Sequence, residues 1–244
     1  NSLATNFINN FVTSPYHFDG IDIDVEQGLD AVNGDDFSNP TGDVGIMIKF
    51  INKLHALDPN LLISLVPQAA NMSPSRNYIG QWANYSAIIN QVNTALSWVG
   101  IQLYNSGGMY GIDNKLYDPN AGDSMIDFST AMATNLMEPW PSQVDSVPTY
   151  FLPFKNTLRP DQVVLGYPSM DNNNSSDGQP GANLTRIKRA IACLTTGKEC
   201  LTYQPPHTYT KIGGVFNWEV SYDQANDFKF AEGLKTCVTT GDCR

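Results

Sequence analysis

The stretch Phe18-Asp-Gly-Ile-Asp-Ile-Asp-Val-Glu26 (residues 18–26) decides the fold of this chain. Its β-branched residues predict a strand, and side chains on a strand point alternately to opposite faces. Three carboxylates then share one face: Asp22, Asp24 and Glu26. We expect this face to be buried, because the aliphatic residues on the other face would pack under helices. Burial and like charge raise the pKa of carboxyl groups, so at least one of the three is expected to hold a proton near neutral pH.

A carboxylic acid with a raised pKa is suited to general acid catalysis. The sequence therefore predicts a proton-sharing row that ends at Glu26, near the carboxyl end of the strand. The alternative is an acidic strand face that is wetted by solvent or binds a cation.

Four further runs rich in β-branched and aromatic residues predict strands: Leu61–Gln68, Trp98–Asn105, Gln162–Ser169 and Ile212–Val220. Segments with apolar residues three and four positions apart predict helices: Ser2–Thr13, Asp43–Leu57, Ser86–Ser97 and Leu184–Leu194. Strands that alternate with helices favour an α/β fold with a parallel sheet. No linker or repeat divides the chain, so one domain is expected.

The composition excludes several classes of partner. The chain has 14 Lys and Arg against 24 Asp and Glu, with a formal net charge of −10. Nucleic acids and anionic membranes are bound through clustered cations, so neither is an expected partner. No apolar run approaches the roughly 18 residues of a transmembrane helix. The first residues show no signal peptide, and we expect a mature or trimmed sequence.

Four cysteines form two close pairs, Cys193 with Cys200 and Cys237 with Cys243. Two short-loop disulfides are the simplest pairing, and an exported protein would form them in an oxidising compartment. Reduced, buried thiols remain the alternative, and a zinc site is less favoured because the gaps are too long. The three histidines are scattered, at His17, His55 and His207. We therefore expect no metal site and no cofactor.

The acidic strand resembles the DxxDxDxE signature of family 18 glycoside hydrolases, the chitinases and their relatives, at Asp19, Asp22, Asp24 and Glu26. The resemblance implies a TIM (β/α)8 barrel in which this segment is the fourth strand. It also implies that Glu26 protonates the glycosidic oxygen and later acts as a base, that Asp24 orients the N-acetyl group of the substrate, and that Asp22 shares a proton with Asp24. The carbonyl of that N-acetyl group, rather than an enzyme carboxylate, would attack the anomeric carbon.

Three later segments resemble the same family in chain order: Leu65–Gln68 the fifth strand, Gln102–Asn105 the sixth and Gly214–Asp223 the eighth. They imply a catalytic role for Tyr104, whose hydroxyl would align the acetamido group. They also imply four substrate-binding residues: Gln68, Gln102, Asn105 and Trp218, the last as the floor of the −1 sugar site. Together the matches favour the bacterial-type branch. Other aromatic residues could stack on sugars or simply pack: Trp82, Trp140, Tyr110 and Tyr117.

The position of the signature conflicts with a complete barrel. The residues before Glu26 suffice for one helix and not for three βα units of roughly 30 residues each. We therefore expect residues 1–244 to be the C-terminal portion of a single catalytic domain, with only strands four to eight of the barrel. The missing N-terminal part of the same barrel would be its partner. The stretch from Ser169 to Ile212 is too short for an insertion domain between strands seven and eight, which implies an open groove.

The resemblance implies a secreted, monomeric chitinase that cleaves internal β-1,4 N-acetylglucosamine linkages with retention. Its partners would be chitin or N-acetylglucosamine oligosaccharides. Two alternatives stay open. One is an endo-β-N-acetylglucosaminidase that acts on N-glycans, and the other is an inactive, lectin-like chitin-binding relative.

Overall fold

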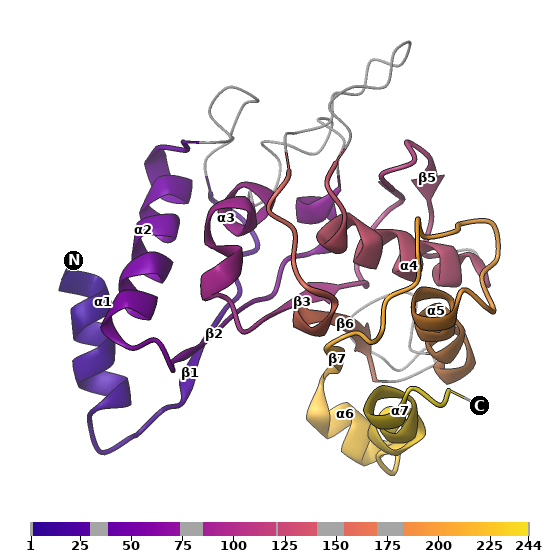
Figure 1. The fold of residues 1–244 in the computed structure, drawn as a ribbon. Helices are drawn as coiled ribbons and strands as arrows, with labels where there is room; N and C mark the ends of the chain where they lie inside the picture. The colour runs from indigo at the N-terminus through magenta and orange to yellow at the C-terminus, as the bar shows by residue number, and fades with distance from the viewer. Residues whose placement is uncertain are drawn as a thin grey trace.

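The computed structural model describes residues 2–29, 39–73, 85–120, 122–140, 154–169 and 183–243. Its main feature is a five-stranded parallel sheet (Figure 1). The strands follow one another in chain order: β1 (Gly20–Ile23), β2 (Leu62–Leu65), β3 (Trp98–Gln102), β6 (Val163–Pro168) and β7 (Gly214–Trp218). The predicted parallel α/β arrangement is confirmed, and each strand lies within its predicted run.

Every strand is shorter than its predicted run, and the difference matters most at β1. The predicted strand continued to Glu26, but β1 ends at Ile23, which pairs with Leu65 of β2. The backbone N–H of Val66 still donates to the Ile23 carbonyl at 3.0 Å. Asp24 and Glu26 therefore lie just beyond the carboxyl end of the paired strand.

The predicted helices are present with small changes at their ends. Helix α1 (Ser2–Phe7) continues as a π-helical turn (Ile8–Val12), and α3 (Tyr85–Val92) continues as a 3-10 turn (Asn93–Ala95). The other two are α2 (Gly42–Leu57) and α5 (Leu184–Thr196), and further 3-10 turns span Ala69–Met72 and Pro160–Gln162. In Figure 1, α1 to α3 lie on the β1 side of the sheet, and α4, α5 and α7 lie towards β6 and β7.

Several elements were not predicted: α4 (Ser124–Met137), α6 (Val220–Ala225), α7 (Lys229–Thr240) and a hairpin of β4 (Met109–Tyr110) and β5 (Leu116–Tyr117). Helix α4 shows why. Every residue from Met125 to Met137 is buried. Its polar residues are buried together with its apolar ones, so the helix has no solvent-exposed face of the kind that marks a surface helix.

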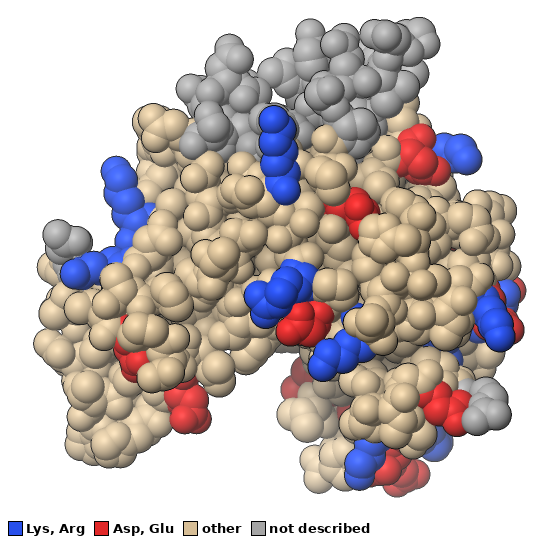
Figure 2. All heavy atoms as spheres, viewed as in Figure 1, with Lys and Arg blue, Asp and Glu red and all other residues tan. Residues whose placement is uncertain are grey.

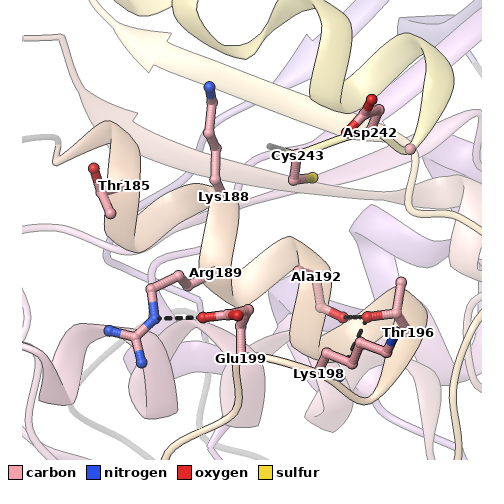
Figure 3. A pocket seen from close by; sticks show the side chains of 10 residues that line it. Thr185, Lys188, Arg189, Ala192, Thr196, Lys198, Glu199, Asp242 and Cys243 are labelled. Carbon is pink, nitrogen blue, oxygen red and sulfur yellow. Dashed lines mark hydrogen bonds and ion pairs between the residues drawn. The ribbon is translucent and has the colours of Figure 1, made fainter.

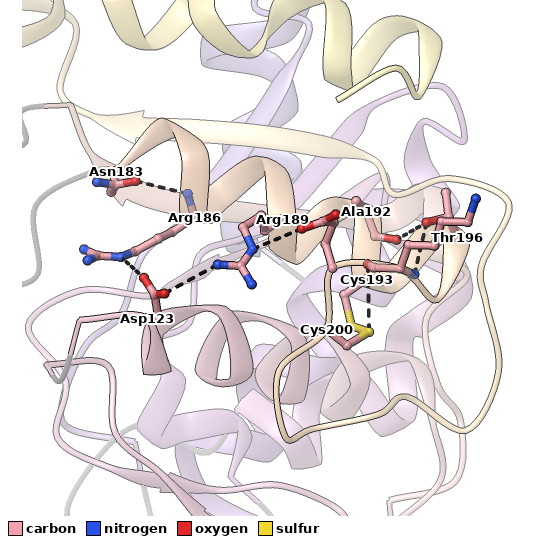
Figure 4. A network of polar contacts seen from close by, with 10 residues as sticks. Asp123, Asn183, Arg186, Arg189, Ala192, Cys193, Thr196 and Cys200 are labelled. Carbon is pink, nitrogen blue, oxygen red and sulfur yellow. Dashed lines mark hydrogen bonds and ion pairs between the residues drawn. A yellow bond between two sulfur atoms is a disulfide. The ribbon is translucent and has the colours of Figure 1, made fainter. Parts of the chain in front are cut away.

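Helix α5 is fixed to its surroundings by a disulfide and by a charged network (Figure 4). The Asp123 carboxylate, just before α4, pairs with Arg186 Nε at 2.9 Å and with Arg189 at 3.5 Å. At the other end of the helix, Cys193 is bonded to Cys200. A second disulfide joins Cys237, within α7, to Cys243 after the helix. The predicted disulfide pairing is confirmed.

The sheet is open, with β1 at one edge and β7 at the other. Figure 2 shows the molecule hollowed between these two ends. Large apolar side chains are exposed near the edges: Phe18 by 49%, Leu62 by 42% and Trp218 by 45%. Within the described ranges no helix is long and apolar enough to cross a membrane, and no three His, Cys, Asp or Glu side chains are arranged to hold a metal ion.

Candidate active site

The three carboxylates of the signature lie together at the carboxyl end of β1, but they are not buried. Asp22, Asp24 and Glu26 are all exposed, so the expectation of a buried acidic face is wrong for this chain. The reason is the open sheet, because the part of the chain that the structure describes leaves the hollow next to this face unfilled. Asp22 is held by a hydrogen bond from Ser64 Oγ on the neighbouring strand, at 2.5 Å.

Gln102, at the end of β3, connects the two later carboxylates. Its side chain is only 3% exposed, and its Nε2 lies 3.2 Å from Asp24 Oδ1 and 3.5 Å from Glu26 Oε1. The same nitrogen donates to the Val66 carbonyl at 3.0 Å. The buried amide of Gln102 therefore holds the Asp24 and Glu26 carboxylates on the same side of the sheet end.

Asp24 is the carboxyl group whose environment favours the protonated form. Although the residue is exposed, neighbouring atoms exclude part of the water around its carboxyl group, which raises its pKa above the ordinary value, and the negative charges of Glu26 and Asp22 raise it further. The hydrogen bond from Gln102 acts in the opposite direction. Asp24 is thus a member of the row with a raised pKa, and the expectation that one of the three holds a proton near neutral pH stays a prediction.

A cavity of about 220 Å³ adjoins the carboxylates. It is lined by side chains from all five strands or their ends: Asp22, Asp24, Val66, Trp98, Gly100, Tyr104, Val164, Phe216 and Trp218. Tyr104 is buried at 6% exposure, whereas Trp218 is the most open of the aromatic residues there. The structure therefore brings two of the predicted aromatic site residues, Tyr104 and Trp218, to the same cavity as Asp22 and Asp24.

Phe216 forms part of this cavity, and two glycines make room for its ring. A Cβ atom added to Gly166 would lie 2.0 Å from the ring, and one added to Gly100 would lie 3.0 Å from it. Phe216 and these glycines were missed in the sequence analysis. Glycine inside a strand is itself a signal that another group approaches closely, so the signal was available.

Gln68 and Asn105 lie at the same edge of the sheet but outside the cavity lining. Gln68 forms an isolated parallel bridge with Gln102 and is half-buried. Asn105 is exposed and has a φ of 50°, in the left-handed region. Their positions fit the mouth of a groove, and their predicted contact with substrate stays a prediction.

Two of the four additional stacking candidates are buried in the structure. Trp140 is 4% exposed, donates from Nε1 to the Asn135 carbonyl and packs on Phe154. Tyr117 is 7% exposed and donates to Asp113 at 2.6 Å, so both are packing residues. Tyr110 is half-buried, and Trp82 lies outside the described residues.

A separate cavity of about 600 Å³ lies between α5 and the end of α7 (Figure 3). Its lining mixes both signs of charge, with Lys188 and Lys198 against Glu199 and Asp242. None of the predicted site residues lines it. The chemistry predicted from the sequence therefore belongs to the smaller cavity beside Asp24.

Several solved structures are similar to this chain. It is similar to the solved C-terminal domain of ChiA from Legionella pneumophila, with 45% identity, a TM-score of 0.89, and coverage of 100% of this chain and 73% of that one. It is also similar to a family GH18 chitinase from Chromobacterium violaceum, with 28% identity, a TM-score of 0.73, and coverage of 94% and 58%. No family model matches the chain.

Curated relatives point the same way. Chitinase D from Niallia circulans is 28% identical over 233 residues, which is 90% of this chain and 41% of that protein. Across the first three such relatives the chain spans between 37% and 44% of their length. The family GH18 structures are TIM-barrel proteins, and the parallel sheet with its helices is of that fold. The chain therefore belongs to the family 18 chitinases of the glycoside hydrolases.

Proposed function

We propose that this chain carries the catalytic carboxylates of a chitinase that hydrolyses β-1,4 linkages between N-acetylglucosamine units. The observation that carries the proposal is the contact of Gln102 Nε2 with both Asp24 and Glu26, beside a cavity that also contains Tyr104 and Trp218. An acid, a second carboxyl group and an aromatic platform at the carboxyl end of parallel strands suit the cleavage of a sugar chain in a TIM barrel.

Glu26 is the general acid in this proposal. Its proton goes to the glycosidic oxygen as the bond from that oxygen to the anomeric carbon breaks. The carbonyl oxygen of the substrate's own acetamido group forms a bond to the anomeric carbon on the opposite face. Water then attacks the same carbon, the bond to the carbonyl oxygen breaks, and the Glu26 carboxylate takes the proton from that water. Two inversions give net retention.

Asp24 and Tyr104 orient the acetamido group in this scheme. The raised pKa of Asp24 favours a carboxyl group that shares a proton, either with Asp22 or with the acetamido nitrogen. The Ser64 hydroxyl holds Asp22, so Asp22 keeps its place while the proton is shared. In this proposal Tyr104 lies beside the sugar, and the exposed ring of Trp218 forms the floor of the sugar site.

We further propose that the five strands are strands four to eight of one barrel, so that residues 1–244 form the C-terminal portion of a single domain. The open edges of β1 and β7 support this, since raw sheet edges pair with further strands. An apolar groove of about 340 Å³ beside β7 supports it as well, with Val215, Phe230 and Leu234 in its lining. The remaining strands would come from chain outside this sequence.

We also propose that the enzyme is secreted and acts within chitin chains rather than from their ends. The two disulfides support export, because such bonds persist in oxidising compartments. The short stretch between Ser169 and Ile212 supports attack on internal linkages, because it leaves no room for an insertion domain that would wall the groove. The predicted monomeric state stays a prediction.

The test is the substrate range of the complete protein. Soluble chitin and its oligosaccharides should be cleaved, whereas cellulose oligosaccharides and fully deacetylated chitosan should not, because they lack the acetamido carbonyl. Early products of mixed length and a rapid fall in viscosity are expected. Efficient cleavage of a glucan would refute the substrate-assisted route. Release of glycans from a high-mannose glycoprotein, without activity on chitin, would instead establish an endo-β-N-acetylglucosaminidase, and binding to chitin without turnover would establish a lectin.

A further inference from the structure

Tyr85 contacts the backbone of the acidic segment from a helix. It is the first residue of α3 and is 1% exposed. Its hydroxyl oxygen accepts a hydrogen bond from the Val25 N–H at 2.6 Å, and the hydroxyl donates to the Ile23 carbonyl at 3.1 Å. Ile23 and Val25 are the two neighbours of Asp24 in the chain. A single phenol therefore holds the backbone on both sides of Asp24.

The sheet does not supply the contact that Tyr85 makes with Val25. Strand β1 ends at Ile23, whose carbonyl also accepts from the N–H of Val66, the residue after β2. Val25 lies beyond the last paired residue, and its N–H would need another acceptor, since an unpaired buried N–H is costly. The Tyr85 hydroxyl is that acceptor. The place where the chain leaves the sheet, carrying Asp24 and Glu26, is thus set by a side chain from α3.

The phenol is also kept in the protonation state that this double contact needs. Burial raises the pKa of Tyr85 above its ordinary value, and the charges of Asp24, Asp22 and Glu26 raise it further, against a lowering by the Val25 hydrogen bond. A neutral hydroxyl can donate to Ile23 and accept from Val25 at the same time. An ionised phenolate could not donate.

We propose that Tyr85 is a positioning residue, whose hydroxyl holds the backbone at Ile23 and Val25 so that the Asp24 and Glu26 carboxyl groups keep their places at the mouth of the cavity. This inference rests on the proposed function. Tyr85 does not line the cavity and does not act on substrate directly. Its effect is on geometry, and a shift of about 1 Å in a reacting group can cost about 100-fold in rate.

The test is Tyr85→Phe in the complete protein, with Tyr209→Phe as the matched control. The first change removes one hydroxyl and keeps the buried ring. Tyr209 is also buried, at 5% exposure, and its hydroxyl donates to Glu138 Oε1 at 2.8 Å, away from β1. For both variants, kcat and KM are measured on a soluble chitin oligosaccharide. Hydrogen exchange of the Val25 amide and the thermal midpoint are measured alongside.

Tyr85→Phe should lower kcat by about 10-fold or more with KM within about 3-fold of wild type, because substrate contacts are kept and the reacting groups shift. The Val25 amide should exchange faster than in wild type. Tyr209→Phe should change neither. A wild-type kcat in Tyr85→Phe would overturn the positioning role. So would a loss of kcat that both variants show in proportion to their fall in thermal midpoint.

The same measurements separate this inference from the function on which it rests. An inactive wild-type protein would refute the chitinase proposal and, with it, a role for Tyr85 in catalysis. An active wild type with unchanged kcat and unchanged Val25 exchange in Tyr85→Phe would refute the Tyr85 inference alone.

Discussion

The pKa of Asp24 is shifted by opposing effects, and this shift contributes to the pH dependence of the protein's stability. Partial exclusion of water and the charges of Glu26 and Asp22 raise the pKa of Asp24 in the folded state, and Gln102 reduces the effect. Below the unfolded-state pKa of about 3.9 the group is protonated in both states and costs nothing. As the pH rises through the window between that value and the higher folded pKa, the unfolded state releases its proton first, and stability is lost.

Asp24→Asn should therefore be more stable than wild type at neutral pH, and the difference should vanish as the pH falls below about 3.9. Thermal unfolding at a series of pH values measures this. Asp123→Asn is the control of opposite sign, because hydrogen bonding to Arg186 lowers the pKa of Asp123, so its loss should weaken the protein at neutral pH. An Asp24→Asn variant that is less stable than wild type at pH 7 would contradict this account.

The row of carboxylates was predictable from the sequence, but its environment was not. Alternation along a strand is a local property, so the shared face of Asp22, Asp24 and Glu26 follows from their spacing. Burial depends on what lies across the hollow, and the contacts of Ser64 and Gln102 depend on the register of strands far apart in sequence. For the same reason the role of Tyr85 could not be predicted, because in the sequence a tyrosine at the first position of a helix resembles any other buried aromatic residue.

At the scale of elements, the inner face of β3, β6 and β7 is built around one ring. Phe216 on β7 occupies the space above Gly100 on β3 and Gly166 on β6. The strands pair in register so that Gly166 lies opposite Phe216. A side chain at either glycine would push the ring towards the cavity that contains Asp24 and Trp218.

Gly166→Ala should destabilise the protein by about 1–3 kcal/mol, as expected for overpacking of a filled interior. Denaturant unfolding measures the change. Gly107→Ala is the matched control, since an added Cβ there would meet no atom within 4 Å. Combining Gly166→Ala with Phe216→Leu should recover part of the loss, because the smaller side chain vacates the space. Equal stability of Gly166→Ala and Gly107→Ala would show that the ring is not confined as described.

Element prediction succeeded where a run of β-branched and aromatic residues marks a strand or apolar spacing marks a helix, and failed elsewhere. The five strands and the amphipathic helices α2 and α5 follow from local pattern. Helix α4 is enclosed on all sides, and the two-residue strands β4 and β5 are too short to show a period. Strand ends were overestimated because pairing stops where the neighbour ends, as at Ile23, and not where β-branched residues run out.

At the scale of the whole molecule, the cavity beside Asp22 and Asp24 is lined by residues from strands across the sheet, whose two edges, β1 and β7, are open. The disulfides and the Asp123 network strengthen the side of the molecule around α5 and α7, away from β1. The carboxyl ends of the strands meet at one site. Strand β1 leads into the row of carboxylates, residues on β2 and β3 hold that row by hydrogen bonds, and β7 contributes the aromatic ring of Trp218.

The most direct measurement is the turnover of Glu26→Gln on a soluble chitin oligosaccharide, made in the complete protein beside Glu199→Gln. Glutamine keeps the shape of Glu26 and the neighbourhood of Gln102 but has no proton to transfer. We predict that turnover falls by about 100-fold or more while the oligosaccharide still binds, and that Glu199→Gln, on the surface near α5, keeps wild-type turnover. A Glu26→Gln enzyme that retained more than about a tenth of wild-type turnover would contradict the assignment of the acid, since general acid catalysis contributes at least about 100-fold.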